Sequence, residues 1–187
     1  LVEGVDVKHY PLVQLRHMVG CVPQKAVLFR GTLRENIQWG KKDASDREIY
    51  EALDTAQARE FVEEKNEGLD LMIQAGGRNL SGGQRQRLTI ARALVRQPDI
   101  LILDDSASAL DFATDARLRK AIRQKTAHMT VFLVSQRAAT VKSADRIVVL
   151  EDGHMAGMGT HRELIKSCQV YREICLSQLS KEEVEEA

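Results

Sequence analysis

Three short apolar runs, each free of charged side chains, are predicted to be strands. They cover residues 19–22, 100–103 and 131–134. A continuous apolar run is typical of a parallel strand that is covered on both faces, because neither face meets water. We therefore expect the runs at 100–103 and 131–134 to be buried strands. The run at 19–22 is expected to end in a loop at Pro23 and Gln24.

A fourth apolar run, at 147–150, is followed by the dipeptide Asp152-Gly153. This pair favours the tight turn of a β-hairpin, because both residues tolerate positive φ angles. The chain is therefore predicted to return as a second strand at 155–158.

Between the strands, apolar residues recur at helical spacing. The segment 46–63 has such a pattern, 84–96 carries an apolar stripe with most of its arginines outside the stripe, and 114–125 indicates a further helix. Thr32 and Glu35 have the spacing of a capping box, which predicts that another helix starts there.

The alternation of strands and helices, with continuous apolar runs, predicts an α/β fold with a mostly parallel sheet. In such sheets, ligands bind beyond the carboxyl ends of the strands. Two carboxylates, Asp104 and Asp105, follow the run at 100–103, and Gln136 lies just after the run at 131–134. These polar residues are therefore the first candidates for a binding site.

Composition and charge narrow the possible functions. The chain has 187 residues, of which 43% are hydrophobic, enough for the core of one compact unit. The chain has 27 lysine and arginine residues and 27 aspartate and glutamate residues, so its formal net charge is zero. No excess of positive charge therefore favours binding to nucleic acid. No apolar run approaches the roughly 20 residues of a membrane-spanning helix. Cys21, Cys168 and Cys175 match no disulfide or metal motif and indicate a reducing, cytoplasmic setting.

The most specific motif is the string Leu80-Ser81-Gly82-Gly83-Gln84. Two glycines directly before a helix let backbone N–H groups approach an anion closely, and the helix dipole favours negative charge there. Ser81 can cap the helix and also bond a phosphate oxygen. The alternative is an ordinary glycine-containing helix start, since short glycine motifs recur by chance.

A second motif is formed by the apolar run 100–103 and the two carboxylates after it. It resembles the Walker B strand of P-loop nucleotide hydrolases, in which the first carboxylate holds Mg²⁺ through water. This motif alone is weak, because buried strands often end in aspartate. Its combination with the glycine-led helix start and with the string at 108–111 is specific.

Together these strings resemble the nucleotide-binding domain of an ABC exporter over nearly the whole chain. Residues 80–84 match the family's LSGGQ signature, Gln24 matches its Q-loop, and 108–111 match its D-loop. Residues 29–37 and 159–164 resemble strings that are typical of exporters. The resemblance implies a P-loop NTPase (RecA-like) parallel-sheet core with an inserted α-helical subdomain.

The same resemblance implies a division of the chain into domains. Residues 1–24 and 99–170 would form the RecA-like core, 25–98 the helical subdomain, and 171–187 a C-terminal helix with a frayed acidic tail. The phosphate-binding Walker A motif G-x-x-x-x-G-K-[ST] does not occur in the sequence. We expect that the sequence starts within the domain, lacks the Walker A strand and helix, and by itself binds ATP poorly and is inactive.

In the family, two such domains pair head to tail around the cofactors ATP and Mg²⁺. The resemblance implies that the signature residues contact the γ-phosphate of ATP held by the partner domain; these are Ser81, Gly82, Gly83 and Gln84. Ser108 and Asp111 of the D-loop are further cofactor-binding residues by the same resemblance.

Other residues are implied to serve the chain's own site. Asp104 and Gln24 are the implied metal-binding residues, and Gln24 is also implied to contact the attacking water while its loop follows the transmembrane domain. Asp105 and Gln136 stand at the family's catalytic positions, which usually hold glutamate and histidine. Asp105 withdraws its carboxylate by roughly 1.5 Å, one C–C bond, and misplacement of about 1 Å can cost on the order of a hundredfold in rate. Gln136 cannot exchange a proton as imidazole does.

These two departures predict a degenerate site. The chain therefore resembles the impaired subunit of a heterodimeric bacterial exporter, at the cytoplasmic face of the plasma membrane, whose intact signature completes the partner's ATPase site. Ala75, where many exporters have glutamate, agrees with that subgroup. Two alternatives stay open: a regulatory module that clamps ATP without hydrolysing it, and a DNA-repair or translation ATPase, against which the balanced charge argues.

Overall fold

The fold is that of a computed structural model, which describes residues 1–106, 109–125, 129–180 and 184. The chain divides into two compact units, Leu1–Val134 and Ser135–Ala187. Each unit is described by itself. The domain boundaries expected at 24, 98 and 170 come from the family resemblance, whereas this division reflects which parts of the chain are compact. Those boundaries stay a prediction.

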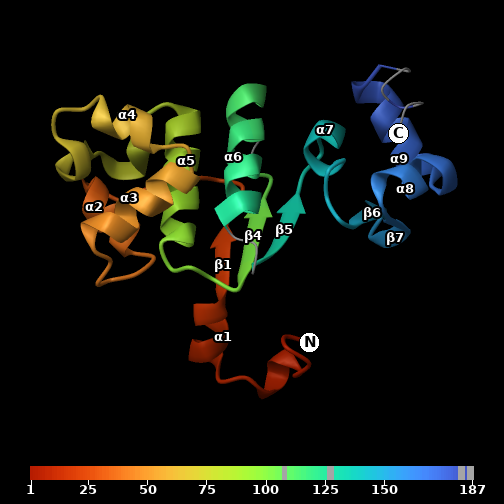
Figure 1. Cartoon of the computed structure of the whole chain (residues 1–187), viewed down its shortest axis with the longest axis horizontal. Coiled ribbons are helices and arrows are strands. Elements are labelled where there is room, and N and C mark those ends of the chain that lie inside the picture. Colours follow the sequence, from red (N-terminus) through yellow and green to blue (C-terminus); the bar gives the residue numbers. More distant parts are fainter. Residues whose placement is uncertain (107–108, 126–128, 181–183, 185–187) are drawn as a thin grey trace. The chain divides into compact units, whose positions relative to one another are not determined.

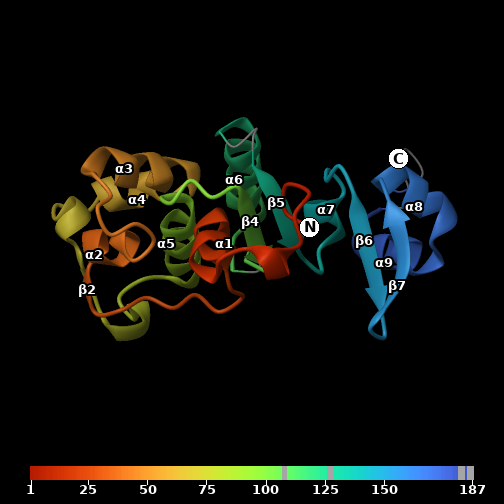
Figure 2. The ribbon, with the colours of Figure 1, turned by 90° about the horizontal axis from the view of Figure 1, so that it is seen from below.

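The first unit contains a parallel sheet of three strands in the order β1 (Val19–Val22), β4 (Ile100–Asp104) and β5 (Thr130–Val134). Figure 1 shows these strands side by side, and Figure 2 shows β4 next to β5 from below. Val22 pairs with Leu103, so the carboxyl ends of β1 and β4 lie at the same edge of the sheet. The predicted α/β fold with a parallel sheet is confirmed, and all three strands coincide with the predicted apolar runs.

The burial of these strands differs from the prediction. Leu101 and Leu103 of β4 are buried, whereas Phe132 of β5 is 56% exposed and its neighbours Val131 and Val134 are also exposed. The expectation that the run at 131–134 is covered on both faces is therefore wrong. The reason is packing: among the described elements, β5 is in close contact mainly with its neighbour β4, so its faces lack a closely packed helix.

Helices and short strands make up the rest of the first unit. Its helices are α1 (Leu12–Met18), α2 (Leu33–Gln38), α3 (Asp46–Thr55), α4 (Arg59–Glu63), α5 (Gly82–Leu94) and α6 (Phe112–Lys125). Strands β2 (Gly31–Thr32) and β3 (Met72–Ile73) form a small antiparallel ladder. The 3-10 turns are η1 (Val7–His9), η2 (Gly68–Asp70) and η3 (Ala75–Gly77). The helical pattern at 46–63 is divided between α3 and α4, because Gln57 between them has a φ of 58°.

Three helices of this unit begin at capping boxes, as polar spacing dictates. The pair Thr32 and Glu35 caps α2 as predicted. The pair Ser45 and Glu48 caps α3 in the same way, and the start of α5 is described with the site below. In each box the side chains satisfy backbone N–H groups that the first helical turn leaves without partners.

Helix α5 lies at the centre of the first unit, against α2, α3 and β1 (Figure 1). Its apolar stripe packs into one core with the stripes of α2 and α3. The largest side chains that are fully buried there include Leu33, Ile37, Ile49, Leu53, Leu88 and Ile90. This packing holds the start of α5 on a rigid support.

Gly40 lies directly against the backbone of α5. A Cβ atom at this position would come within 2.0 Å of the Arg92 carbonyl oxygen and 2.8 Å of Val95 Cγ1. We expect Gly40→Ala to lower the free energy of unfolding of the chain by about 1 to 3 kcal/mol, because α2 and α5 must move apart. The measurement is the urea unfolding midpoint.

The control for this variant is Gly82→Ala, because a Cβ atom at Gly82 has no neighbour closer than 3.9 Å and replaces glycine within a helix. Gly82→Ala is expected to keep or raise the midpoint. An unchanged midpoint for Gly40→Ala would contradict the close contact.

The second unit joins a hairpin to short helices. Strands β6 (Ile147–Glu151) and β7 (His154–Gly159) pair antiparallel, followed by α8 (His161–Ser167) and α9 (Gln169–Gln178); α7 (Ala138–Val141) precedes them. The predicted hairpin is confirmed, and its turn residues Asp152 and Gly153 have φ angles of 47° and 78°. Of the predicted frayed tail at 181–187, all but Val184 lies outside the described residues, and Val184 is buried.

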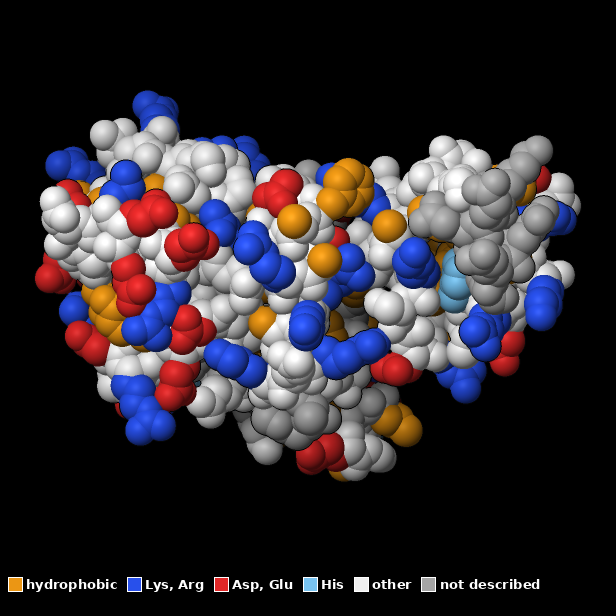
Figure 3. Space-filling model, turned by 45° about the horizontal axis from the view of Figure 1, so that its top comes forward, with side chains coloured by type: hydrophobic (Ala, Val, Ile, Leu, Met, Phe, Trp, Pro, Cys, Tyr) orange, Lys and Arg blue, Asp and Glu red, His pale blue; other side chains and the backbone are white. Residues whose placement is uncertain are grey.

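Charged side chains of both signs are mixed on the surface. On the face drawn in Figure 3, acidic and basic side chains alternate over the part of the first unit formed by α2, α3 and α4. This mixing over α2, α3 and α4 agrees with the balanced composition. Among the described residues, no helix has both the length and the apolar character needed to cross a bilayer.

Candidate functional site

The carboxyl ends of β1 and β4 bring two of the predicted residues together. Gln24 follows β1, and its Nε2 donates a hydrogen bond of 3.2 Å to Oδ2 of Asp105, which follows β4. Asp104 is the last residue of β4 and is exposed. These side chains come from segments about 80 residues apart in the chain because neighbouring parallel strands end at the same edge.

Asp105 has an unusual backbone conformation. Its φ is 42°, in a region that few non-glycine residues adopt, although aspartate tolerates it better than most. Its N–H donates to the Val134 carbonyl oxygen at 3.0 Å, which fixes the turn to the end of β5. The Asp105 carboxylate is therefore aimed by both its backbone and Gln24.

A second group of predicted residues forms the start of α5. Ser81 Oγ accepts from the N–H of Gln84, and Gln84 Oε1 accepts from the N–H of Ser81, so the predicted cap is a full capping box. The helix itself offers no acceptor to the N–H groups of Gly82 and Gly83, which belong to its first turn. Two amides and the Ser81 hydroxyl are thus left to bind an acceptor from outside the helix.

These amides open into a hollow of about 400 Å³ shared with the segment before α6. Its lining residues are Ser81, Gly82, Gly83, Arg87, Ala109, Leu110, Asp111 and Thr114. A Cβ atom at Gly83 would come within 3.2 Å of the Ala109 carbonyl oxygen. Glycine at this position therefore keeps the hollow open and lets the two segments approach.

Asp111 stands at the entry to α6. Its Oδ1 accepts from the N–H of Thr114 at 2.9 Å, and this hydrogen bond lowers the pKa of the Asp111 carboxyl. The side chain is therefore ionised and helps fix the wall of the hollow. Ser108, the other D-loop residue that was predicted to bind the cofactor, lies outside the described residues.

Arg87 is a lining residue that the sequence did not single out as part of the site. Its guanidinium lies 4.9 Å from the centre of the Phe61 ring and donates from Nη1 to the Gln57 carbonyl oxygen at 2.5 Å. Burial lowers the pKa of Arg87, and the Asp111 carboxylate opposes that shift. Its Nε is buried without an acceptor among the described residues. The sequence does contain a signal for this role, because Arg87 comes four residues after Gly83 and so lies on the same side of the helix.

The remaining predicted residues lie elsewhere. The Gln84 side chain is used in the capping box and is not part of the lining of the hollow. Gln136 belongs to the second unit, where its carbonyl oxygen accepts from Nε2 of Gln178 at 2.9 Å. The structure thus gathers the predicted residues of the first unit at two places: the strand ends, and the start of α5.

The chemistry of these two places suits a phosphate and a magnesium ion. Free amides at a helix start, a serine hydroxyl and a nearby arginine are donors to an anion. Asp104 and Gln24 supply oxygen atoms at one sheet edge, and oxygen is the ligand that Mg²⁺ prefers. Within residues 1–106, 109–125, 129–180 and 184, no cluster of three His, Cys, Asp or Glu side chains is placed to hold a metal. A magnesium ion here would depend on water and phosphate for its other ligands.

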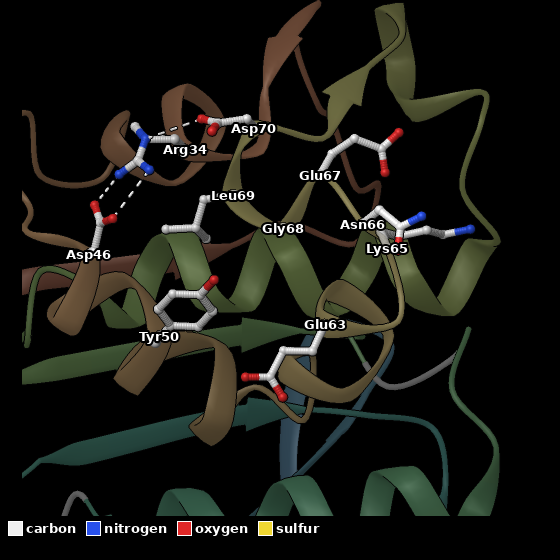
Figure 4. A pocket seen from close by; sticks show the side chains of 10 residues that line it. All are labelled: Arg34, Asp46, Tyr50, Glu63, Lys65, Asn66, Glu67, Gly68, Leu69 and Asp70. Carbon is white, nitrogen blue, oxygen red and sulfur yellow. Dashed lines mark hydrogen bonds and ion pairs between the residues drawn. The ribbon is translucent and has the colours of Figure 1, made fainter.

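Another hollow, of about 330 Å³, lies among α2, α3, α4 and η2 (Figure 4). Arg34 bridges two elements there, with hydrogen bonds to Asp46 at the start of α3 and an ion pair of 3.7 Å to Asp70. The hydrogen bond to Asp46 raises the pKa of Arg34. By these contacts Arg34 joins α2 to the start of α3 and to η2 at this hollow.

Comparison with known proteins gives one consistent result. The profile of the ABC transporter family matches residues 1–108. YfiB, an ABC transporter ATP-binding protein of Bacillus subtilis, is 46% identical over 181 residues, which are 97% of this chain and 31% of that protein. YheI, a probable multidrug resistance ABC transporter ATP-binding/permease protein of Bacillus subtilis, is 44% identical over 91% of this chain and 29% of its own length.

A solved structure agrees with these relatives. The structure of a bacterial Atm1-family ABC exporter with ATP bound superposes with a TM-score of 0.92 at 35% identity, over 97% of this chain and 32% of that one. The chain therefore spans about a third of the length of the proteins it matches, at 29% to 32% of each.

Proposed function

Since this chain belongs to the ABC transporter family, we propose that it couples ATP binding and hydrolysis to transport as the ATP-binding domain of an exporter. Its fold and family support the ATP-binding domain, with nucleotide as the ligand. The coupling, the partner domains and a place at the cytoplasmic face of the plasma membrane are the proposed part. In this proposal residues 25–98 act as the helical subdomain beside the core of 1–24 and 99–170.

The hollow at the start of α5 is the observation that carries the proposal. Two backbone amides, one hydroxyl and an arginine line a single space. The eight lining residues include no aromatic side chain on which an adenine ring could stack. Such a space fits the terminal phosphate of a nucleotide held mainly by another domain. Ser81, Gly82 and Gly83 are therefore proposed to complete the ATP site of a partner domain, with Gln84 holding the helix start in shape.

The chain's own site is proposed to be degenerate. Asp105 and Gln136 replace the glutamate and histidine of the family pattern, and the Asp105 carboxylate is already bonded to Gln24. A chain with an impaired site of its own can still complete the ATP site of a partner through its intact helix start, if that partner has the catalytic residues that this chain lacks. We therefore propose a heterodimer in which the partner's ATP is hydrolysed.

The test is steady-state ATP hydrolysis by the full-length transporter subunit, alone and together with its partner. We expect the pair to turn over ATP about a hundredfold faster than the subunit alone, because a catalytic carboxylate displaced by about 1 Å costs that much. Equal rates for the two preparations would refute the degenerate site. No turnover in either, with tight ATP binding, would favour the alternative of a non-hydrolysing ATP clamp, which the same two substitutions support.

A surface for the transmembrane domain is proposed at Phe29 and Trp39. Their rings stack with centroids 4.6 Å apart, and both are exposed, Trp39 by 68%. Two large stacked aromatic side chains in water are a typical anchor for another protein. The match to about a third of an ATP-binding/permease protein supports the membrane-embedded part as the occupant.

A further inference from the structure

The exposed aromatic pair is fastened to the interior by one buried asparagine. Asn36 on α2 is 1% exposed. Its Oδ1 accepts from the N–H of Phe29 at 2.9 Å, and its Nδ2 donates to the carbonyl oxygens of Phe29 and Thr32 at 2.9 and 3.0 Å. Both backbone polar groups of Phe29 are thus held by a single side chain, so the ring cannot shift without moving α2.

Arg92 of α5 ties the same network to the central helix. Its Nε donates to the Asn36 carbonyl oxygen at 2.8 Å, its Nη2 to Asn36 Oδ1 at 3.0 Å and its Nη1 to the Val27 carbonyl oxygen at 2.9 Å. Its guanidinium also lies 5.4 Å from the centre of the Phe29 ring. The hydrogen bond from Arg92 Nη2 is the second that Asn36 Oδ1 accepts, and Asn36 Nδ2 already donates two. The Asn36 side chain therefore makes all the hydrogen bonds it can.

A second contact between the aromatic pair and α5 is independent of these hydrogen bonds. Gly40, the residue after Trp39, packs on the backbone of Arg92 so closely that a Cβ atom would lie 2.0 Å from its carbonyl oxygen. The exposed pair therefore meets α5 at one residue in two ways, through the side chain of Arg92 and through its backbone.

Arg92 lies on α5, the helix that Ser81 caps. The two residues are eleven residues apart, which is about 16 Å along the axis of an α-helix. A fully hydrogen-bonded buried network is rigid, and a helix moves as a unit, so a displacement of the aromatic pair reaches the glycine-led start of α5 with little loss.

We propose that Arg92 is the positioning residue that couples the Phe29–Trp39 surface to the phosphate-binding start of α5. The inference rests on the proposed function. Docking of the transmembrane domain on the aromatic pair sets the position of α5 through Arg92, and so sets how well Ser81, Gly82 and Gly83 meet the partner's phosphate.

The test is a double-mutant cycle between Trp39→Ala and Arg92→Lys. Lysine keeps the charge but has a single nitrogen in place of the three guanidinium nitrogens that bond Val27 and Asn36. Full-length transporter with its partner is reconstituted in vesicles of phosphatidylethanolamine and phosphatidylglycerol, and hydrolysis is measured against MgATP concentration. Each single variant is expected to lower kcat about fivefold, the lower end of ordinary coupling between sites, with KM for MgATP unchanged.

The double variant is expected to be no slower than the slower single variant, because both changes break the same connection. Losses that multiply would show independent effects and overturn the proposal, as would wild-type kcat in Arg92→Lys. The matched control is Arg96→Lys, two residues past the end of α5, where Arg96 bonds only to the Arg16 carbonyl oxygen among the contacts described. Arg96→Lys is expected to keep the wild-type kcat.

A second measurement does not depend on the folding of an Arg92 variant. Trp39 is the chain's single tryptophan and is mostly exposed, so Trp39→Ala leaves the core intact. In the assembled transporter, amide hydrogen exchange at residues 82–88 is expected to rise about fivefold in Trp39→Ala, with exchange in β4 unchanged. Unchanged exchange at 82–88 would overturn the coupling. A wild-type transporter that hydrolyses no ATP would instead count against the proposed function.

Discussion

Replacing Ser81 with alanine is expected to lower ATP hydrolysis at the partner's site about a hundredfold, the effect of removing one preorganised hydrogen-bond donor from a developing charge. Ser81 lines the hollow together with Gly82 and Gly83. Its hydroxyl oxygen already accepts from the N–H of Gln84, so its proton is available to a phosphate oxygen. The measurement is single-turnover hydrolysis by the assembled pair, with each site's nucleotide followed separately.

The variant also removes a helix cap, and that effect must be separated from the loss of the donor. Ser45→Ala is the matched control, because Ser45 and Glu48 form the same capping box at the start of α3, away from the hollow. Both variants are expected to cost about 1 kcal/mol of stability. Only Ser81→Ala is expected to slow hydrolysis. Loss of nucleotide from this chain's own site in Ser81→Ala would contradict the head-to-tail arrangement.

The second large effect is a gain. Asp105→Glu together with Gln136→His is expected to raise hydrolysis at this chain's own site about a hundredfold in the full-length complex. The longer side chain carries the carboxylate about 1.5 Å farther from the backbone, beyond its bond with Gln24. Histidine at 136 restores a side chain that can exchange a proton near neutral pH.

Two controls define what this gain means. Asp99→Glu makes the same exchange at an exposed position just before β4 and is expected to change nothing. Asp105→Asn keeps the shorter length without the charge and is expected not to raise the rate. If single-site turnover of the Asp105→Glu and Gln136→His double variant stays at the wild-type level, another residue limits that site.

Much of the fold was predictable because it depends on neighbours in the sequence. The hairpin at Asp152 and Gly153 follows from the φ angles that these residues tolerate, and the helix starts at Thr32 and Ser81 follow from side chains that reach the N–H three residues on. The parallel strands follow from uninterrupted apolar runs. The division of 46–63 into two helices was missed, because the positive φ of Gln57 has no signature in that pattern.

The candidate site was predictable as a set of residues and unpredictable as a geometry. The glycine-led string marked Ser81, Gly82 and Gly83, and the strand ends marked Asp104 and Asp105. That Gln24 bonds to Asp105 was not predicted from the residue pattern. The roles of Arg87 and Arg92 were also missed, since the helical pattern places most arginines of 84–96 outside the apolar stripe without saying what they touch.

By itself, then, the sequence determined the strands, the helix starts, the hairpin and the identity of the motif, because propensity, capping and turn chemistry act over a few residues. The tertiary structure alone decided that β5 is exposed, that Gly40 rests on Arg92 and that Asn36 and Arg92 form one buried network. Such contacts join segments as much as 65 residues apart. Their existence depends on how whole helices pack against one another and the sheet, which no local pattern contains.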